Sequence, residues 1–479
     1  MNIRENDSST PETKELRWKL IAATWAFAAV LHILTFKWLA PPSVLGWTYL
    51  AATFLLIAKP SSWGRFCLFL GITAGAFLIH YSKLSNHLVL EFWLVLAGIA
   101  IGMWHFLSGK HSKERRLFKT IAPLARAFYG LLFLFSFFAK LNSSFFDPDS
   151  SCAAHFMRSI VESYGLTEIL GEWAATDLAG HGAIGLTLAC ELSVPLLLFW
   201  RRTLRAGMVL ATIFHLLMGL VPVLGISSFS AFSWVLLLFF LPETSWVALE
   251  QRMQRCRDRS IEQTSKKRIL KRLLLGGVAA LVWWQIAMIH PGPWLAIVFW
   301  LAGSAPFIVL ILQSLRRIQG QAPTEDKPWL CTRPWPLNLL IIPVIILGTL
   351  PYLGLQTRGS FTIFSNLRIL GDQPNHFIVP ASWKIHEPEL IKIINTNHPT
   401  LKEFATKNLL ITEHELRRFI HQEAIDFFLI CEIEGEAVWL QRSGGKDTDH
   451  ALMKSAPFLQ SHFIRYKPVS TAKLAPCAW

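Results

Sequence analysis

Charged residues are scarce in this sequence. Only 16% of its 479 residues are Asp, Glu, Lys or Arg, whereas a soluble protein of ordinary composition carries about a quarter. Hydrophobic residues make up 52% of the chain, and its mean hydropathy is +0.39. This balance argues against a soluble globular protein and indicates a chain that resides mainly in a membrane.

Cysteine is also scarce, and acidic residues are outnumbered by basic ones. The 7 cysteines form no CxxC pair and no Cys/His cluster at the spacing of metal ligands, so we expect no metal site. The formal net charge is +14. In a membrane protein such an excess fits cytoplasmic loops that face anionic lipid. Because no basic cluster alternates with stacking aromatics, we exclude nucleic acid as a partner.

Long apolar runs occupy most of the chain. They fall near residues 18–38, 43–58, 66–80, 88–107, 121–140, 182–200, 204–224, 226–241, 273–290, 292–315 and 336–355. Several are shorter than the ~20 residues that a perpendicular helix needs, and the second and third could form one broken or re-entrant unit. The runs predict an all-α polytopic membrane bundle of about eleven spans within residues 18–355.

The basic loops predict the orientation of this bundle, because Lys and Arg concentrate on the cytoplasmic side. With residues 1–17 as a cytoplasmic tail, alternation places every strongly basic loop on that same side. These loops are 59–65, 110–119, 201–205, 252–272 and 316–333, whereas the acidic loop 142–180 lies opposite. We therefore expect a multi-pass membrane protein with residues 356–479 outside the cytoplasm.

Residues 356–479 have the composition of a soluble domain. Glu387–Asn395 is interpreted as a helix, and a capping box at Thr412–Glu415 is expected to start a second helix that continues through Ile420. The segments 427–433 and 436–442 read as strands of a hairpin with a turn at Gly435. The sequence thus predicts a small extracytoplasmic α+β domain, which could bind a protein partner.

Four ionisable side chains in or at the ends of the apolar runs are candidates for function. They are His32, Lys140, Glu191 and His215, and each is a candidate because charge inside a bilayer is costly. Structural roles are the alternatives: a headgroup anchor for Lys140, a pair with a neighbouring helix for Glu191, and neutral hydrogen-bonded imidazoles for the histidines. These alternatives stay open at the level of sequence.

A family resemblance connects three of these candidates. FFAKLNSSFF followed by DPDSSC, then ELSVPLLLFW and FHLLMGLVPVLGISSFSAF, resembles the vitamin K-dependent gamma-carboxylases and the related horizontally transferred transmembrane (HTTM) proteins of bacteria. The match runs roughly from Arg126 to Pro242. In the tail, GLQTRGSFTIFSNLRILGDQPNH and the closing CAW look like bacterial HTTM proteins specifically.

The resemblance implies a chemistry for the site. It implies that Lys140 is the base that deprotonates a vitamin K-like hydroquinone, with Glu191 and His215 in the same core. It also implies a quinone-like or lipid-like ligand and a location in the bacterial inner membrane. A lysine acts as a base only when it is neutral, and burial in apolar surroundings favours the neutral form. A close pair with Glu191 would instead keep Lys140 charged, so that it could bind an anion but could not act as a base.

The tail limits how far the resemblance extends. Gamma-carboxylases carry a much larger lumenal domain than residues 356–479 provide, so carboxylation of protein glutamates is not implied. The rival hypothesis is non-enzymatic: a membrane anchor or assembly partner whose outer domain binds another protein. A transporter ranks third, because no pair of Gly/Pro-broken helices recurs in two halves.

A disulfide is expected outside the cytoplasm. The predicted topology places Cys152 and Cys477 there, where oxidation is permitted, and both flank family-like motifs (DSSC and PCAW). We predict that they join the outer loop to the end of the tail. Cys431 is the alternative partner, although its place in a predicted strand favours a buried thiol.

Overall fold

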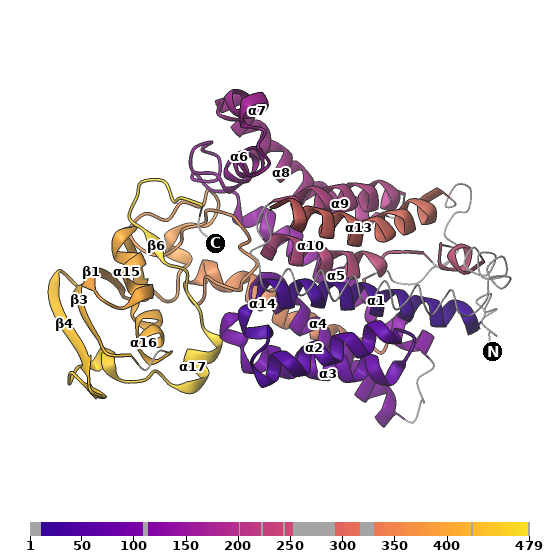
Figure 1. Ribbon diagram of the computed structural model, residues 1–479, viewed down its shortest axis with the longest axis horizontal. Coiled ribbons are helices and arrows are strands. Elements are labelled where there is room, and N and C mark those ends of the chain that lie inside the picture. Colours follow the sequence, from indigo (N-terminus) through magenta and orange to yellow (C-terminus); the bar gives the residue numbers. More distant parts are fainter. Residues whose placement is uncertain are drawn as a thin grey trace.

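The computed structural model describes residues 11–108, 114–200, 202–221, 224–242, 245–251, 293–316, 330–422 and 425–477. A bundle of apolar helices adjoins a smaller C-terminal domain that contains a β-sheet (Figure 1). The bundle helices are α1 (Pro11–Thr35), α2 (Val44–Ala58), α3 (Trp63–Ile79), α4 (Asn86–Leu107), α5 (Glu114–Ala139), α8 (Asp177–Phe199), α9 (Leu204–Met218), α10 (Leu224–Leu238), α13 (Pro293–Arg316) and α14 (Ile342–Thr349).

Five stretches of the described chain are long and apolar enough to cross a membrane as helices. They are Leu16–Thr35, Asn86–Leu107, Leu117–Ala139, Asp177–Phe199 and Trp335–Leu353. In lipid, a helix satisfies its backbone donors and acceptors internally, which is why uninterrupted apolar runs adopt this form. The protein is therefore a helical membrane protein. The count of eleven spans stays a prediction, and the run 273–290 lies outside the described residues.

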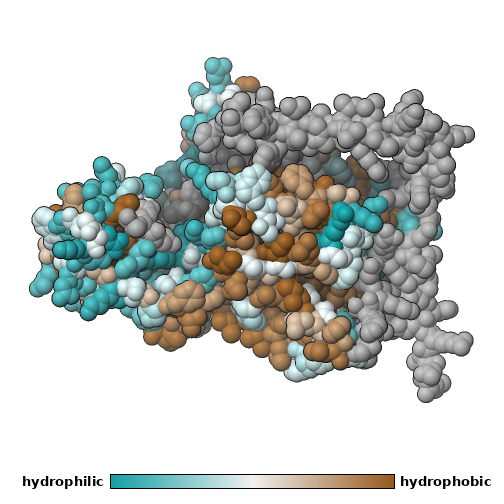
Figure 2. All heavy atoms as spheres, turned by 60° about the horizontal axis from the view of Figure 1, so that its bottom comes forward, coloured by the Kyte–Doolittle hydropathy of each residue, from teal (hydrophilic) through white to brown (hydrophobic). Residues whose placement is uncertain are grey.

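The bundle is apolar both inside and outside. Figure 2 shows hydrophobic side chains gathered over the bundle, whereas hydrophilic ones cover the C-terminal domain. The second and third runs form the short helices α2 and α3, with exposed apolar residues such as Trp47, Phe54 and Leu68. Both alternatives, two spans or one broken or re-entrant unit, stay predictions. An aromatic such as Trp25 of α1 is instead fully enclosed. The exposed apolar belt is the surface that lipid would cover.

The loop between α5 and α8 contains two short helices. These are α6 (Cys152–Ser163) and α7 (Thr167–Ala174), which project from one end of the bundle beside the C-terminal domain (Figure 1). Ser151 caps α6 by accepting a hydrogen bond from Ala153 N. Since Lys140 follows the last residue of α5 at this same end, α6 and α7 lie next to the predicted site.

The C-terminal domain is built on a six-stranded antiparallel sheet with the order β5-β4-β3-β1-β2-β6. Its strands are β1 (Leu390–Thr396), β2 (Leu409–Thr412), β3 (Phe427–Ile433), β4 (Glu436–Ser443), β5 (Lys446–Asp447) and β6 (Val469–Ser470). Its helices are α15 (Pro399–Thr406), α16 (Glu413–Gln422) and α17 (Phe458–Phe463). The expectation of a small C-terminal region with both helix and strand is confirmed.

One helix assignment in this region is wrong. The segment Glu387–Asn395 was expected to be helical, but its residues from Leu390 onward belong to strand β1. Ile391 and Ile393 are buried while Lys392 between them is exposed, which is the period of a strand. The cluster of β-branched isoleucines favours that conformation, and pairing with β2 and β3 on both sides stabilises it.

The other local predictions in the domain are confirmed. Strands β3 and β4 pair in a hairpin whose turn residues Glu434 and Gly435 both have positive φ, 50° and 84°. Such a turn matches the twist of the paired strands and favours Gly. Helix α16 begins directly after Thr412, whose Oγ1 accepts a hydrogen bond from Glu415 N at 3.3 Å. This is one of the two hydrogen bonds of a capping box, whereas the Glu415 carboxylate accepts from Arg418 and Tyr466 N instead.

Candidate functional site

Lys140 lies inside the bundle, directly after the last residue of α5. Its side chain is only 2% exposed. Lys140 Nζ donates to Ser136 Oγ at 2.8 Å and to Ile363 O at 2.6 Å. Because Ser136 stands one helical turn before Lys140, the two side chains share a face of α5. The lysine therefore points inward, toward α8 and the segment that follows α14, and not toward headgroups.

Glu191 of α8 is the ion-pair partner of Lys140. Its Oε1 lies 2.9 Å from Lys140 Nζ and also accepts a hydrogen bond from Ser136 Oγ at 3.1 Å. The other carboxylate oxygen, Oε2, is buried and has no hydrogen-bond partner. A buried carboxylate oxygen without a donor is costly, so this atom is available to a group that enters the site.

A cavity of about 690 Å³ adjoins this ion pair. Residues of α5, α6, α7, α8 and α9 line it. Residues near the start of α10, and two residues of the segment that follows α14, complete the lining. Most of these residues are apolar, and Ser136, Lys140 and Glu191 supply polar groups at one place. The cavity thus has one polar end and long apolar walls, a shape suited to an amphiphile.

The segment of residues 360–366, here called the cap loop, closes the polar end. Ile363 and Phe364 line the cavity, and the Ile363 carbonyl receives the hydrogen bond from Lys140. Phe361 and Phe364 have φ of 61° and 45°, a backbone region that non-glycine residues rarely adopt and that carries strain. Strong tertiary contacts must therefore hold this loop in place.

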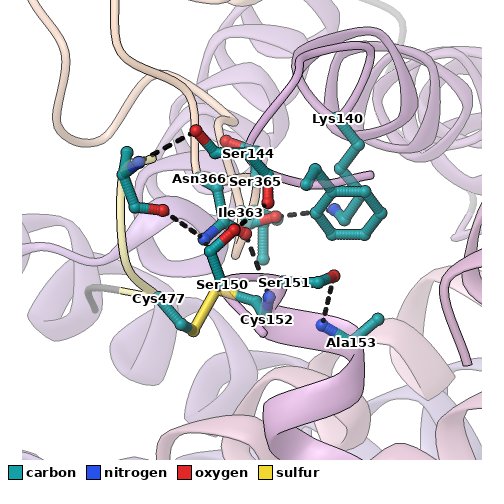
Figure 3. The surroundings of a disulfide bond; sticks show 12 residues. Lys140, Ser144, Ser150, Ser151, Cys152, Ala153, Ile363, Ser365, Asn366 and Cys477 are labelled. Carbon is teal, nitrogen blue, oxygen red and sulfur yellow. Dashed lines mark hydrogen bonds between the residues drawn. A yellow bond between two sulfur atoms is a disulfide. The ribbon is translucent and has the colours of Figure 1, made fainter. Parts of the chain in front are cut away.

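Asn366 and a disulfide supply such contacts (Figure 3). Asn366 accepts a hydrogen bond from Cys152 N at 3.0 Å and donates to Ser150 O at 2.7 Å and Ala475 O at 3.0 Å. Cys152 and Cys477 form the expected disulfide, with Cα atoms 4.8 Å apart. Cys431 is a buried free thiol, as predicted. The outer loop, the cap loop and the end of the chain are thereby fastened together.

His215 lies near the cavity but outside the ion pair. Its Nε2 is 2.9 Å from the Tyr129 hydroxyl, and its ring packs against Phe133, Phe214 and Phe229. Those three phenylalanines line the cavity, whereas His215 does not. The structure thus brings Lys140 and Glu191 together and leaves His215 behind an aromatic wall.

His32 belongs to a second buried polar network. Its Nε2 lies 2.8 Å from Glu91 Oε2 and its Nδ1 2.6 Å from Ser228 Oγ. His87 Nε2 lies 3.1 Å from the same hydroxyl, and Trp25 donates to Glu91 at 2.6 Å. Sequence reasoning missed Glu91 and His87. The available signal was their spacing: they are one helical turn apart in a single apolar run, so they share a face of α4.

Other residues that complete the site were also missed. Ser136 gave no sequence signal, because serine is common in apolar helices, and the Ile363 carbonyl could be placed only by tertiary structure. Within the described ranges, no group of three His, Cys, Asp or Glu residues is arranged to hold a metal ion. No family model, curated protein or solved structure matches this chain.

The arrangement supports one kind of chemistry. A hydroxyl at the polar end of the cavity would meet a carboxylate oxygen that accepts and an ammonium that donates. If that hydroxyl gave its proton to Glu191, the resulting oxyanion would lie beside the positive charge of Lys140, which would stabilise it. In this geometry Glu191 carries the free lone pair and Lys140 the positive charge.

Proposed function

We propose that this protein binds a membrane-resident amphiphile whose hydroxyl-bearing, quinol-like head contacts Lys140 and Glu191. One observation carries the proposal: a largely apolar cavity ends at a buried ion pair that retains an unpartnered acceptor, Glu191 Oε2. Buried acceptors of this kind are rare unless a donor completes them. The hydroxyl of a ligand is such a donor.

The charge of the site favours a neutral head over an anionic one. The ammonium of Lys140 is matched by the carboxylate of Glu191 at 2.9 Å, so the polar end carries no net charge. An anion would gain from Lys140 but would be repelled by Glu191. A neutral hydroxyl instead donates to Glu191 and accepts from Lys140, which satisfies both groups at once.

The walls of the cavity favour a ligand that arrives from lipid. Leu186 of α8 and Ile213 and Leu217 of α9 line the cavity and are also 63%, 49% and 52% exposed. The exposure of these apolar side chains supports an opening of the cavity toward lipid. A molecule dissolved in the bilayer can enter there without crossing water.

Orientation and family belong to the same proposal. The one-sided basic loops support a cytoplasmic N-terminus with residues 356–479 outside, and the resemblance to HTTM proteins supports a location in the bacterial inner membrane. The residues that resemble HTTM proteins and gamma-carboxylases include Lys140, Glu191 and the cap loop, which supports quinol binding and proton transfer from the quinol. A protein partner of the outer domain is the rival function.

The test is a binding measurement with matched ligands and variants. Adding 1,4-naphthohydroquinone to the purified protein should quench the tryptophan fluorescence, because Trp173 lines the cavity. The dimethyl ether of the same ring has no donor and should bind about tenfold more weakly or worse, as expected for losing a hydrogen bond to a charged group. Glu191→Gln and Lys140→Ala should lose affinity for the hydroquinone to a similar degree.

Two further variants sharpen the result. Lys140→Arg should retain part of the binding, because the guanidinium keeps the positive charge, but it cannot act as a base. Lys83→Ala, at an exposed lysine outside the cavity, is the control and should bind as the wild type does. Equal affinity of the wild type for both ligands, or unchanged affinity in Glu191→Gln and Lys140→Ala, would contradict the proposal.

A further inference from the structure

A second polar cluster lies where the bundle meets the C-terminal domain. The backbone N–H groups of Thr357 and Arg358 both donate to Arg465 O, at 3.0 and 3.2 Å. The chain just after α14 therefore runs beside the chain just after α17. The first turns of α16, which carry Glu415 and Arg418, pack against this junction, because Glu415 accepts a hydrogen bond from Tyr466 N at 2.9 Å.

Glu415 is the carboxylate of this cluster, and its oxygens are already engaged. Oε2 accepts from Arg418 Nε at 2.8 Å and Nη2 at 2.5 Å. Oε1 accepts from Tyr466 N and lies 3.5 Å from Arg465 Nε. One carboxylate is thus shared between two buried guanidinium groups.

Positive charge exceeds negative charge here. Arg358, Arg418 and Arg465 lie within electrostatic range of one another, and among the described carboxylates Glu415 alone forms an ion pair with any of them. Arg465 is 5% exposed, and its Nη1 is buried without a hydrogen-bond partner. Burial, together with the charges of Arg358 and Arg418, lowers the pKa of Arg465 to about 9.

We propose that Arg358, Arg418 and Arg465 form a binding site for a phosphate group. Arg418 and Arg465 are buried and share one carboxylate, and an uncompensated buried charge is strongly unfavourable. Arg358, which is exposed, adds a third positive charge within range. A phosphate monoester carries about −1.5 to −2 at neutral pH and accepts paired N–H donors from arginine. It supplies both the missing charge and an acceptor for Arg465 Nη1.

Two sources of phosphate fit the position of the cluster. Helix α17 directly precedes Arg465 in the chain. It contacts the bundle through His462, whose Nε2 lies 2.6 Å from Leu78 O. The exposed side chains of Phe458, Leu459 and Ile79 make that region apolar, so the headgroup of a membrane lipid can reach this level. A free phosphate from the aqueous side is the other source. The site shares no residue with the cavity and does not depend on its ligand.

The experiment uses the full-length protein, purified in detergent and delipidated. Its thermal unfolding is compared in phosphate and in chloride at equal ionic strength, and with phosphatidic acid or phosphatidylcholine added to the micelles. Wild-type protein should unfold several degrees higher with inorganic phosphate or phosphatidic acid. A response to phosphatidic acid alone identifies a lipid as the source, and a response to inorganic phosphate identifies a soluble one.

The variants test the assignment. Arg358→Gln changes an exposed residue, so the variant should fold. Without phosphate it should unfold at a higher temperature than wild type, because repulsion among the arginines is relieved. It should also lose the stabilisation by phosphate. Arg465→Gln should lose that response too. Arg417→Gln, one residue from Arg418 but paired with Glu413, should keep it, as should Lys140→Ala. Absence of any phosphate-specific shift in the wild type, or its equal loss in Arg417→Gln, overturns the proposal.

Discussion

Lys140 and Glu191 show how single charged residues are kept inside this apolar bundle. Each is nearly excluded from solvent, and each has the other as its counter-charge at 2.9 Å. Ser136 contacts both, so one hydroxyl bridges the pair. His32 and Glu91 form a second buried pair, again with a serine alongside. The arginine cluster around Glu415 differs, because there two buried guanidinium groups share one carboxylate.

Lys467 offers a test of charge at the junction between the two domains. Its Nζ donates to Thr362 O at 3.0 Å, next to the carbonyl that binds Lys140. Burial, together with the charges of Arg358 and Lys140, lowers the pKa of Lys467 from 10.5 to about 8. In the unfolded chain the lysine keeps its proton up to higher pH, so the unfolded state binds more protons between these two values.

The expected result is a stability that rises with pH in this window. The ionised Lys467 destabilises the fold fully below pH 8, and the cost disappears as pH rises toward 10.5. Lys467→Met should remove this contribution, so the stability difference between wild type and variant should shift in favour of the wild type as pH rises. Thermal unfolding of both proteins across this range measures the difference. Parallel curves would contradict the lowered pKa.

At the scale of elements, two helices and the cap loop together form the site. Helices α5 and α8 position Lys140 and Glu191, and the cap loop completes the site with the Ile363 carbonyl and with Phe364, whose backbone is strained. The disulfide joins α6 to the end of the chain next to this loop. Because strained backbone persists only where surrounding contacts over-determine it, the disulfide is expected to support the cap loop.

Removal of the disulfide should therefore destabilise the protein and loosen the site. Cys477→Ser is expected to lose about 2–5 kcal/mol of stability, the usual range for a native disulfide, and to weaken binding of the hydroquinone. Thermal unfolding of wild type with and without reductant should show the same loss. Cys67→Ser, at an exposed free cysteine of α3, serves as the control. If reduction leaves the unfolding temperature unchanged, the supporting role is wrong.

At the scale of the whole molecule, the candidate functional features lie at one end of the bundle. The end of α1 meets the start of α4 through His32 and Glu91, close to the contact of α17 with the bundle. The start of α1 therefore lies at the far end, opposite the C-terminal domain (Figure 1). The cavity, the disulfide and the arginine cluster all gather at the end that carries this domain.

This arrangement yields a prediction about membrane topology. The cytoplasmic basic loops and the outer C-terminal domain should lie on opposite sides of the bilayer, because positive loops are retained inside. A reporter that is active only in the cytoplasm should work when fused at Ser260 and fail at Gly444, and an export-dependent reporter should behave in the opposite way. Activity of one reporter at both positions would exclude an odd number of spans between Ser260 and the outer domain.

The sequence by itself determined what depends on local pattern. Apolar length predicted the membrane helices, a capping box predicted the start of α16, and a glycine turn predicted the β3–β4 hairpin. These features are set by neighbouring residues, so they can be read without knowing the fold. The segment 387–395 was misassigned because its isoleucines suit two periods, and pairing with β2 and β3 decided in favour of the strand.

Only the tertiary structure decided what the buried polar residues do. Lys140, Glu191 and His215 looked equivalent in sequence, yet packing paired the first two and placed His215 behind aromatic rings. The Ile363 carbonyl and the excess of arginines around Glu415 depend on segments brought together from distant parts of the chain. Burial and distance set the energy of a charge, and neither quantity is fixed until the helices and the C-terminal domain have packed.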